Sequence, residues 1–435
     1  MKPLCVVSCP IDTFSGYGAR SRDFVKALIQ LKDKEWDIKI LPQRWGECPW
    51  NYLSQDNPIR NRFINGLQRQ PDIWFQITVP NEFQPVGKFN VGVTAGIETD
   101  IFPSQFLEGM NKMNLNLVSS KHSKLVAQRT QFDRLNPQTK QKEGTLKLEK
   151  PCEILFEGLD LDKYFKIQQP KSTILTDIPE DFCFLFTGHW LPGIFGEDRK
   201  NVATLIKTFL ETFNGPGKKK PALVLKTNNV NYSILDRENI LKHINRLKKS
   251  YGSANSPNIY LLHGEMTDEE MNNLNNDPKV KSFVSFTKGE GFGRPLLESA
   301  ITGKPVITTN WSGHIDFIKP DYNVLIGGSL KEIHKSVSNE FLIENSRWFN
   351  LDDQVAKKAL KDVFKNYKKY YKDSRKQTQY LKENWSFTKM VEKLNTYLPK
   401  VEAAPQTVGI KLPKLKKVTQ EPSKIKLPKL KKIEA

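Results

Sequence analysis

The sequence predicts an α/β protein with two doubly wound domains that face each other across a cleft. Short apolar runs alternate with longer stretches of helical periodicity, which is typical of parallel sheets covered by helices. The chain has 435 residues, and a single hydrophobic core stops growing at roughly 250–300 residues, so at least two domains are expected. A polar stretch with two prolines, at 166–180, separates two series of apolar runs and is the expected linker.

The first domain is expected over residues 1–168, as an acceptor-side half. Its apolar runs predict strands at 4–8, 37–41, 73–77, 90–94, 115–119 and 153–156. Between the first two of these, Phe24, Leu28 and Leu31 recur every three or four residues and predict a helix over 19–32. Strand, helix and strand together form one βαβ unit.

The second domain is expected over residues 169–384. Its strands are predicted at 182–187, 222–226, 259–263, 280–286, 305–309 and 323–326. Helices fit between them at 201–213, 235–250, 268–275 and 294–302. Ligands of doubly wound sheets bind outside the carboxyl ends of the strands, so the loops that follow these strands are the candidate sites.

The C-terminal part of the chain is strongly basic. A helix is predicted over 354–382, with a core-facing stripe that includes Ala356, Leu360 and Val363. Its opposite side carries Lys357, Lys361, Lys365, Lys368 and Lys372. Residues 400–435 repeat the sequence Ile-Lys-Leu-Pro-Lys-Leu-Lys-Lys from positions 410 and 425, and they are predicted to form a disordered basic tail.

Composition limits the possible classes of protein. A hydrophobic content of 38% supports ordinary cores and excludes wholesale disorder. No run approaches the roughly 18 apolar residues that a membrane-spanning helix needs, so any membrane contact is expected to be peripheral. The N-terminal apolar run is too short for a signal peptide. The cysteines in apolar, strand-like runs favour a reduced compartment and a cytoplasmic location; they are Cys5, Cys9, Cys152 and Cys183.

The charge balance predicts a polyanionic partner. The chain carries 67 Lys and Arg against 48 Asp and Glu, a net charge of +19 that would attract nucleic acid, anionic lipid or phosphorylated substrates. The basic helix at 354–382 and the tail at 410–433 are the candidate DNA-binding segments. A solvated surface without a partner is the alternative for both segments. No protein partner of the tail can be named.

The residues with the clearest chemical meaning lie between positions 287 and 307. They predict a strand, a glycine-rich loop, a helix with Pro295 in its first turn, and a further strand. Gly289, Gly291 and Gly293 would let the backbone approach a ligand closely. Free amides at a helix start suit a diphosphate.

Two glutamates stand beside this expected phosphate site, Glu290 in the loop and Glu298 one turn into the helix. Carboxylates do not bind phosphates, but they accept hydrogen bonds from hydroxyls. The pair therefore predicts contacts with a sugar and with a ribose. Simple capping of the helix start is the plainer interpretation of either glutamate alone.

The run Gly-Glu-Gly-Phe-Gly-x-Pro-Leu-x-Glu, from position 289 to Glu298, resembles the signature of retaining GT-B glycosyltransferases of the large family 4. Further matches follow in order at 16–18, 157–165, 199–201, 263–270 and 385–387, so the resemblance covers residues 1–398. It implies two Rossmann-like domains and a helix at 385–399 that crosses back to the first domain. The residues at 291–295 and 311–314 are also similar to uncharacterised glycosyltransferases of large tailed phages.

The resemblance also implies roles for single residues. Glu290 would hold the transferred sugar, Glu298 would bind the ribose, and Lys200 would neutralise the leaving diphosphate. The family's arginine after the first strand of this domain is absent, and the candidates for the second cation are Arg199, Lys226 and Arg294. Glu98 is the acceptor-side catalytic candidate. The other donor-binding candidates are Gly16, Gly18, His263, Gly291, Phe292 and Gly293.

These residues predict a retaining glycosyltransferase that moves a sugar from a nucleotide-diphosphate sugar to an acceptor hydroxyl. Because side chains can stabilise the leaving group, no metal or cofactor is expected. The leading acceptor hypothesis is a hydroxylated base of phage DNA, modified in the host cytoplasm. The alternatives are a surface glycan or lipid acceptor at an anionic membrane, and an inactive scaffold that binds nucleic acid.

Overall fold

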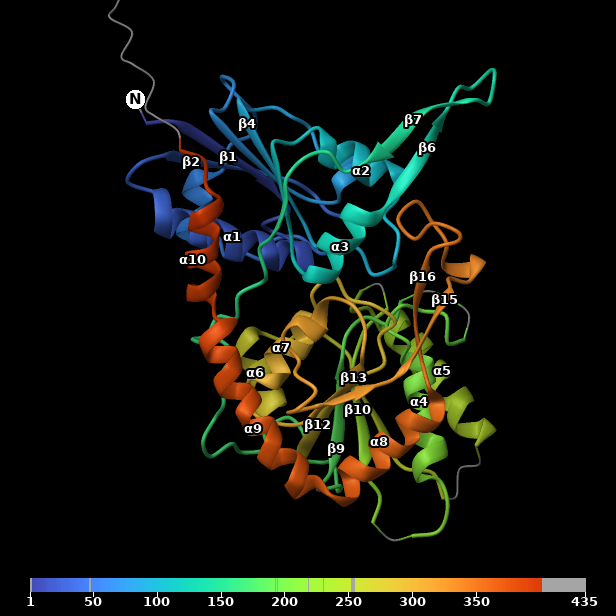
Figure 1. Cartoon of the computed structure of the whole chain (residues 1–435). Coiled ribbons are helices and arrows are strands. Elements are labelled where there is room, and N and C mark those ends of the chain that lie inside the picture. The colour runs from blue at the N-terminus through green and yellow to red at the C-terminus, as the bar shows by residue number, and fades with distance from the viewer. Residues whose placement is uncertain are drawn as a thin grey trace, which may run out of the picture.

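Two six-stranded parallel sheets with helices packed against them form the framework of the protein (Figure 1). The structure is a computed structural model that describes residues 2–46, 48–191, 193, 195–217, 219–229, 231–251 and 255–400. The basic tail predicted from the sequence lies outside the described residues, apart from Lys400.

The first sheet has the strand order β2-β1-β3-β4-β5-β8. The chain therefore starts in the interior of this parallel sheet, adds β2 on one side of β1, and then adds β3 and the later strands on the other side. Val7 of β1 pairs with Ile40 of β2 and with Phe75 of β3, and all three side chains are buried. The strand bounds are β1 (Leu4–Cys9), β2 (Asp37–Pro42), β3 (Ile73–Ile77), β4 (Phe89–Thr94), β5 (Leu115–Val118) and β8 (Cys152–Ile154). The helices are α1 (Gly16–Lys32), α2 (Ser104–Asn111), α3 (Lys121–Arg129) and the short η1 (Pro58–Arg62) and η2 (Pro80–Glu82).

The second sheet has the order β11-β10-β9-β12-β13-β14. Its strand order reverses between β9 and β12, with β10 and β11 added on one side and β12 to β14 on the other, all parallel. Its strands are β9 (Cys183–Thr187), β10 (Ala222–Lys226), β11 (Ile259–Leu262), β12 (Val280–Ser285), β13 (Val306–Thr309) and β14 (Val324–Ile326). Its helices are α4 (Val202–Phe213), α5 (Ile234–Ser250), α6 (Asp268–Asn276), α7 (Arg294–Ala300) and the short η3 (Gly313–Asp316). The six predicted strands and the helices predicted between them are therefore confirmed to within a few residues.

The single basic helix predicted at 354–382 is wrong, because two helices occupy this stretch. They are α8 (Asp353–Lys365) and α9 (Tyr367–Asn384), and Asn366 between them has φ −111° and ψ 30°. The side-chain amide of Asn366 donates to the Asp362 carboxylate, and asparagine side chains that bond locally compete with the helical backbone. The predicted core-facing residues Ala356, Leu360 and Val363 are all fully buried.

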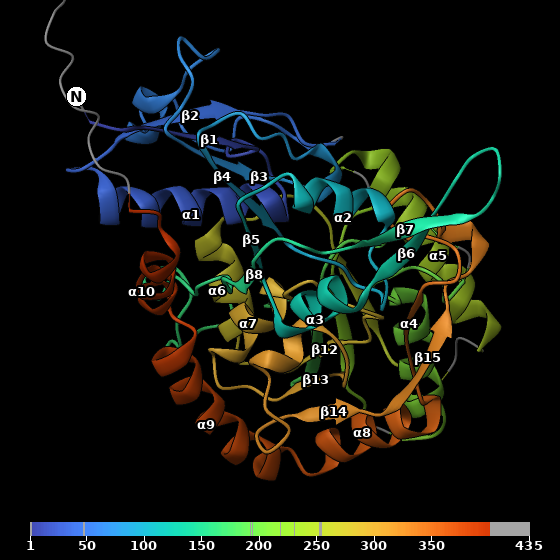
Figure 2. The same cartoon turned by 45° about the horizontal axis from the view of Figure 1, so that its top comes forward.

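Two antiparallel hairpins were not predicted. One is formed by β6 (Gln131–Leu135) and β7 (Lys142–Lys147), and the other by β15 (Gly328–Glu332) and β16 (Arg347–Leu351), with the short η4 (Lys335–Val337) between its strands. Most of their residues are exposed and polar, so the apolar pattern that marks a strand is weak in them. The first hairpin projects from the body of the molecule (Figures 1 and 2).

The last helix returns to the first domain. α10 (Phe387–Tyr397) lies against α1 in both views (Figures 1 and 2). The carbonyl of Trp385 accepts from the Leu159 amide at 2.8 Å, and the Leu159 carbonyl accepts from the Phe387 amide at 2.8 Å. A Cβ on Gly158 would lie 2.7 Å from Cα of Phe387, so only glycine allows this approach. The rings of Phe292 and Phe317 pack on Trp385 and join the cores of the two domains.

None of the helices in the described part of the chain combines the length and the apolar character that crossing a membrane requires.

Candidate functional site

A cleft of about 500 Å³ lies between the two domains and is lined by loops that follow the strands of both sheets. On the second-domain side it lies where β9 and β12 end, at the point where the strand order of that sheet reverses. This is the expected place for a ligand in a doubly wound sheet. Most of the predicted site residues line the cleft, namely Gly16, Glu98, Arg199, Lys200, Lys226, Glu290, Gly291, Phe292, Gly293, Arg294 and Glu298.

Glu290 is held between two cations in this cleft. Nζ of Lys200 lies 2.6 Å from one carboxylate oxygen of Glu290, and Nη1 of Arg199 lies 3.2 Å from the other. Arg199 also reaches Glu98 of the first domain, with 3.4 Å between Nη1 and Oε1. Burial opposes ionisation of Glu290, but the charges of Lys200 and Arg199 outweigh it and lower its pKa to about 2. The carboxylate is therefore ionised at every physiological pH.

The local sequence places both cations. Arg199 and Lys200 precede α4, whose first residues are positioned by Asn201 in the left-handed conformation with φ 57°. Asparagine tolerates this conformation better than most residues. Glu290 comes from the loop after β12, where its amide donates to Oγ of Ser312 at 2.8 Å. The predicted grouping of Lys200 with Glu290 is thus present, and Arg199 is the candidate cation that stands beside them.

Glycine is required at positions 289 and 291 by contacts with the first domain, and not by the close approach to a ligand that we predicted. A Cβ on Gly289 would lie 2.2 Å from the carbonyl oxygen of Glu98, and one on Gly291 would lie 2.5 Å from that of Ala95. The first domain therefore occupies the space that we expected a ligand to take at these two positions. Gly293 is required by its backbone, with φ 103° at the start of α7.

Arg294 stands apart from the two cations on Glu290 and is surrounded by carboxylates. Its Nη1 lies 2.6 Å from Asp23 and 3.3 Å from Glu157, both in the first domain, and its Nε lies 3.4 Å from Glu298. Arg294 therefore links the domains. The sequence indicated Arg294 only as a candidate cation for the diphosphate. Burial raises the pKa of Glu298 to about 7, although Arg294 acts in the opposite direction.

Lys226, the third candidate cation, ends β10 and donates to the carbonyl of Gly264 at 2.6 Å. Burial lowers its pKa. Its ammonium lies over the ring of Tyr232, with 5.6 Å between Nζ and the ring centroid. Lys226 therefore lines the cleft from the β10 side and has no contact with Glu290.

Two predicted donor-binding residues do not line the cleft. Nε2 of His263 lies 2.9 Å from Asp236 of α5, and the ring is buried there. The ring also packs on Tyr232, with 6.1 Å between the ring centroids, and it does not line the cleft, so direct donor contact by His263 is not supported. Gly18 is explained by packing, because a Cβ would lie 2.2 Å from the carbonyl oxygen of Thr13. Gly16 borders open space in the cleft.

The fold adds residues that sequence reasoning missed. Asp268 accepts hydrogen bonds from Lys163 at 2.5 Å, from Tyr164 at 3.0 Å and from Tyr52 at 3.4 Å. Asp268 thus adds a carboxylate to the lining of the cleft, and these three partners belong to the first domain. One signal pointed to acidic partners in the cleft, namely a charged residue, Arg294, at a position where the resembling family usually has an apolar one.

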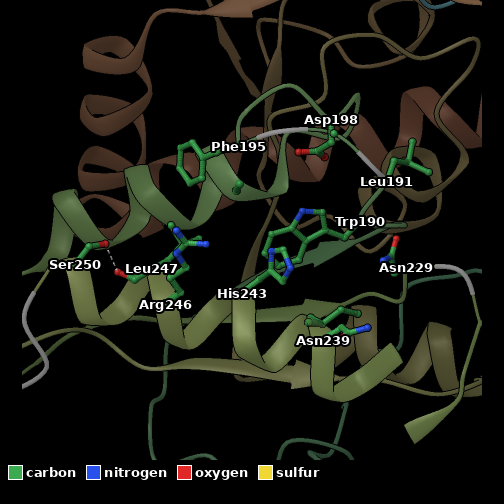
Figure 3. A pocket seen from close by; sticks show the side chains of 13 residues that line it. Trp190, Leu191, Phe195, Asp198, Asn229, Asn239, His243, Arg246, Leu247 and Ser250 are labelled. Carbon is green, nitrogen blue, oxygen red and sulfur yellow. Dashed lines mark hydrogen bonds between the residues drawn. The ribbon is translucent and has the colours of Figure 1, made fainter. Parts of the chain in front are cut away.

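A second cavity, of about 620 Å³, lies in the second domain between α4, α5 and the chain that follows β9 (Figure 3). Trp190 and His243 lie next to each other in its wall and pack edge to face, with 5.7 Å between their ring centroids. Phe195 and Asp198 come from the same chain segment that carries Arg199. Residues 192 and 194 of this segment lie outside the described residues.

Within the described ranges, the His, Cys, Asp and Glu side chains form no group of three or more that could hold a metal ion.

No protein-family model and no curated protein matches the sequence. Solved structures do match the fold. HepE from Anabaena in complex with UDP and glucose is 12% identical, with a TM-score of 0.57 over 91% of this chain and 99% of that one. Sucrose-phosphate synthase from Thermosynechococcus elongatus is 10% identical, with a TM-score of 0.58 over 91% and 98%. A glycosyltransferase from Rickettsia africae is 13% identical, with a TM-score of 0.57 over 91% and 97%.

These likenesses and the two parallel sheets show that the chain has the GT-B fold, which confirms the predicted fold class.

Proposed function

We propose that the protein is a glycosyltransferase that moves a sugar from a nucleotide-diphosphate sugar to an acceptor hydroxyl. The observation that carries this proposal is the placement of Glu290 between Lys200 and Arg199 in the cleft between the domains. HepE, which shares the fold, has been crystallised with UDP and glucose and with UDP-glucose. That donor class supports the proposal.

The two cations would receive the diphosphate of the donor. When the bond between the anomeric carbon and the phosphate oxygen breaks, its electron pair stays on the diphosphate, and Lys200 and Arg199 stabilise the added charge. Glu290 then accepts hydrogen bonds from hydroxyls of the transferred sugar, for which its ionised carboxylate is suited. Because two side-chain cations stand here, the proposed step does not require a metal.

At the other end of the cleft, Glu298 would accept hydrogen bonds from the ribose hydroxyls. One of its oxygens is 3.4 Å from Nε of Arg294, and Arg294 has Asp23 and Glu157 as further partners. The arginine can therefore stay charge-paired while Glu298 turns to a ligand. In this proposal the nucleoside lies near Arg294 and the reacting bond lies near Lys200.

Retention of the anomeric configuration is a finer part of the proposal, and the resemblance of the segment from Glu290 to Glu298 supports it. In a retaining transfer the acceptor hydroxyl arrives on the face that the diphosphate leaves, and a diphosphate oxygen is then the nearest base for its proton. Proton NMR of the product, with the coupling at the anomeric carbon compared with that of the donor, tests retention directly.

The donor proposal is tested with the full chain and a panel of nucleotide sugars. We expect one or more donors to bind in calorimetry and to be hydrolysed slowly to the nucleoside diphosphate and free sugar when no acceptor is added. Binding of none of them would contradict the proposal. Hydrolysis would also exclude the alternative of an inactive scaffold.

A hydroxylated DNA base is one of two candidate acceptors, and the net charge of +19 favours it. Two observations weaken the role of the basic helices. Lys357 of α8 is paired with Glu211 and with Asp353, at 2.6 Å and 3.0 Å. α8 lies at the end of the second domain opposite the first domain (Figures 1 and 2). Gel shifts with modified duplex DNA across salt concentrations test this acceptor, and no binding even at low salt contradicts it.

Liposome co-sedimentation separates the DNA acceptor from the glycan or lipid acceptor at an anionic membrane, since only the latter requires binding to anionic vesicles.

A further inference from the structure

We propose that the carboxyl edge of the first sheet holds a separate acceptor subsite, which binds one hydroxylated sugar ring. This inference rests on the proposed function. A cavity of about 280 Å³ lies where β1, β2 and β3 end. The side chains that carry the argument are Ser8, Gln43, Arg44, Trp45, Thr78 and Glu82.

The position of this cavity follows from topology. The strand order of the first sheet reverses between β1 and β3, and Ser8 and Thr78 stand at the ends of those two strands. Ligands of open α/β sheets bind outside the strand ends at such a reversal. The donor cleft occupies the equivalent place in the second sheet, between β9 and β12. Each sheet thus presents one site at its own reversal point.

The two sites share a wall. Trp45 lines both the donor cleft and the smaller cavity. Its ring lies 4.6 Å from the ring of Tyr17, measured between centroids, and the Tyr17 hydroxyl is held by Oγ1 of Thr94 at 2.9 Å. A ring bound in the smaller cavity would therefore lie next to the cleft in which the sugar is released.

The polar groups of the cavity suit a ligand that donates hydrogen bonds. The Thr78 hydroxyl donates to one oxygen of the Glu82 carboxylate, and no residue of the described chain donates to the other oxygen. Ser8 is 4% exposed, lines the cavity, and has no hydrogen-bond partner for its hydroxyl within the described ranges. A carboxylate only accepts hydrogen bonds, so the ligand must present hydroxyls or amides to it.

The frame around these groups is fixed. The side-chain amide of Gln76 donates to the Glu82 carbonyl at 2.7 Å, and its oxygen accepts from the Gln84 amide at 2.9 Å. Gln76 therefore holds the short helix that carries Glu82. The indole of Trp45 offers an apolar face against which the C–H face of a sugar ring can pack.

Size and charge favour a neutral sugar over a nucleotide of DNA. The cavity is smaller than the roughly 300–1,000 Å³ of pockets for drug-sized ligands, so it accommodates one ring. Its wall holds one cation, Arg44, whose described partner is the ring of Trp50, and one carboxylate, Glu82. A flipped base brings a phosphate on each side, and a wall with one cation and one carboxylate has no net positive charge to bind them.

The test uses the full chain, a donor that the protein hydrolyses, and the free monosaccharides glucose, galactose, mannose and N-acetylglucosamine as probes. For the Glu82→Gln variant, which keeps the bond from Thr78, we expect the KM of the accepted monosaccharide to rise at least tenfold. Donor hydrolysis without acceptor is expected to stay at the parent rate. Ser8→Ala should shift the same KM by a smaller factor, and Glu108→Gln, an exposed glutamate of α2, is the matched control.

Binding is measured separately by saturation-transfer NMR with monosaccharide alone, which needs no donor. A signal from the parent that is lost in Glu82→Gln supports the subsite even if no nucleotide sugar is turned over. Failure of the proposed function can therefore be told apart from failure of the subsite. An unchanged KM in both variants overturns the subsite. Transfer to hydroxymethylated DNA with no transfer to any monosaccharide overturns it as well.

Discussion

Glu290 and Arg294 lie in the same cleft, four residues apart in the sequence, in opposite charge environments. Glu290 is one carboxylate between two cations, Lys200 and Arg199, all from the second domain. Arg294 is one cation among three carboxylates, two of which belong to the first domain. We call these the Glu290 cluster and the Arg294 cluster. The first can release two cations to an anionic ligand, whereas the second holds the domains together.

The largest effect is expected from breaking the Arg294 cluster. Arg294→Leu leaves Asp23, Glu157 and Glu298 without their cation in a largely buried place. Removing one partner of a buried ion pair costs about 3–5 kcal/mol, so the free energy of unfolding should fall by that order. Urea denaturation measures it. Adding Asp23→Asn and Glu157→Gln should restore part of the loss, and a stability equal to that of the parent would contradict the role of Arg294 as a link.

Breaking the Glu290 cluster is expected to lower turnover. Lys200→Ala removes one of two cations that stabilise the leaving diphosphate, and loss of one such group lowers kcat by about 10²–10³-fold. Initial rates of transfer, or of donor hydrolysis, measure the change. Lys34→Ala, an exposed lysine without an ion pair in the described structure, is the control. Turnover equal to the parent rate would remove Lys200 from the site.

The pH dependence of stability should separate the two clusters, because their glutamates shift in opposite directions. The pKa of Glu298 is raised to about 7, so the folded state holds its proton between about pH 4.5 and 7 while the unfolded chain has lost it. Stability therefore falls as pH rises through this window, by up to about 3 kcal/mol at 1.36 kcal/mol per pKa unit. Glu298→Gln should reduce the slope in this window, to which Asp198, with a pKa that burial raises to about 6, still contributes.

Glu290 gives the opposite slope at lower pH. Its pKa is lowered to about 2, so its stabilising contribution is complete above about pH 4.5 and is lost as pH falls toward 2. Glu290→Gln should make that acid limb shallower, with Asp72, whose pKa is also lowered to about 2, still contributing, and it should leave the window above pH 4.5 as in the parent. Thermal unfolding followed from pH 2.5 to 8 measures both limbs, and equal profiles for the two variants would show that the clusters are not distinct.

The smallest effect is expected at the exposed rim of the contact between the domains, where Arg347 meets Asp100. Arg347 of β16 contacts Asp100 of the first domain with 2.7 Å between Nε and Oδ2, but its side chain is 53% exposed. Solvent-exposed ion pairs contribute about 0–1 kcal/mol. Arg347→Ala should therefore lower the free energy of unfolding by less than about 1 kcal/mol and change the Kd of the donor by less than a factor of about 5. A loss as large as that of Arg294→Leu would place the main link between the domains at the rim.

The six strands of the second sheet and the helices between them were predictable because each is an apolar run or a helical stripe of its own. The grouping of Glu290 with Lys200 was also predictable, from the motif in which each stands. The partners of Arg294 were not, since Asp23 and Glu157 lie 271 and 137 residues away in the chain. The break at Asn366 was missed because the stripe of large apolar side chains continues across it. Leu360 and Val363 precede Asn366, and Tyr367 and Tyr370 follow it.

The sequence alone determined the two sheets, the glycine-rich loop and the presence of two glutamates and a lysine near one another, because these depend on local pattern and short spacing. Only the tertiary structure decided what each charge faces. The closed contact of Glu98 and Ala95 with Gly289 and Gly291 is one such outcome. A pKa or an ion pair depends on distances between residues that are remote in the chain, and those distances exist only once the two domains have packed.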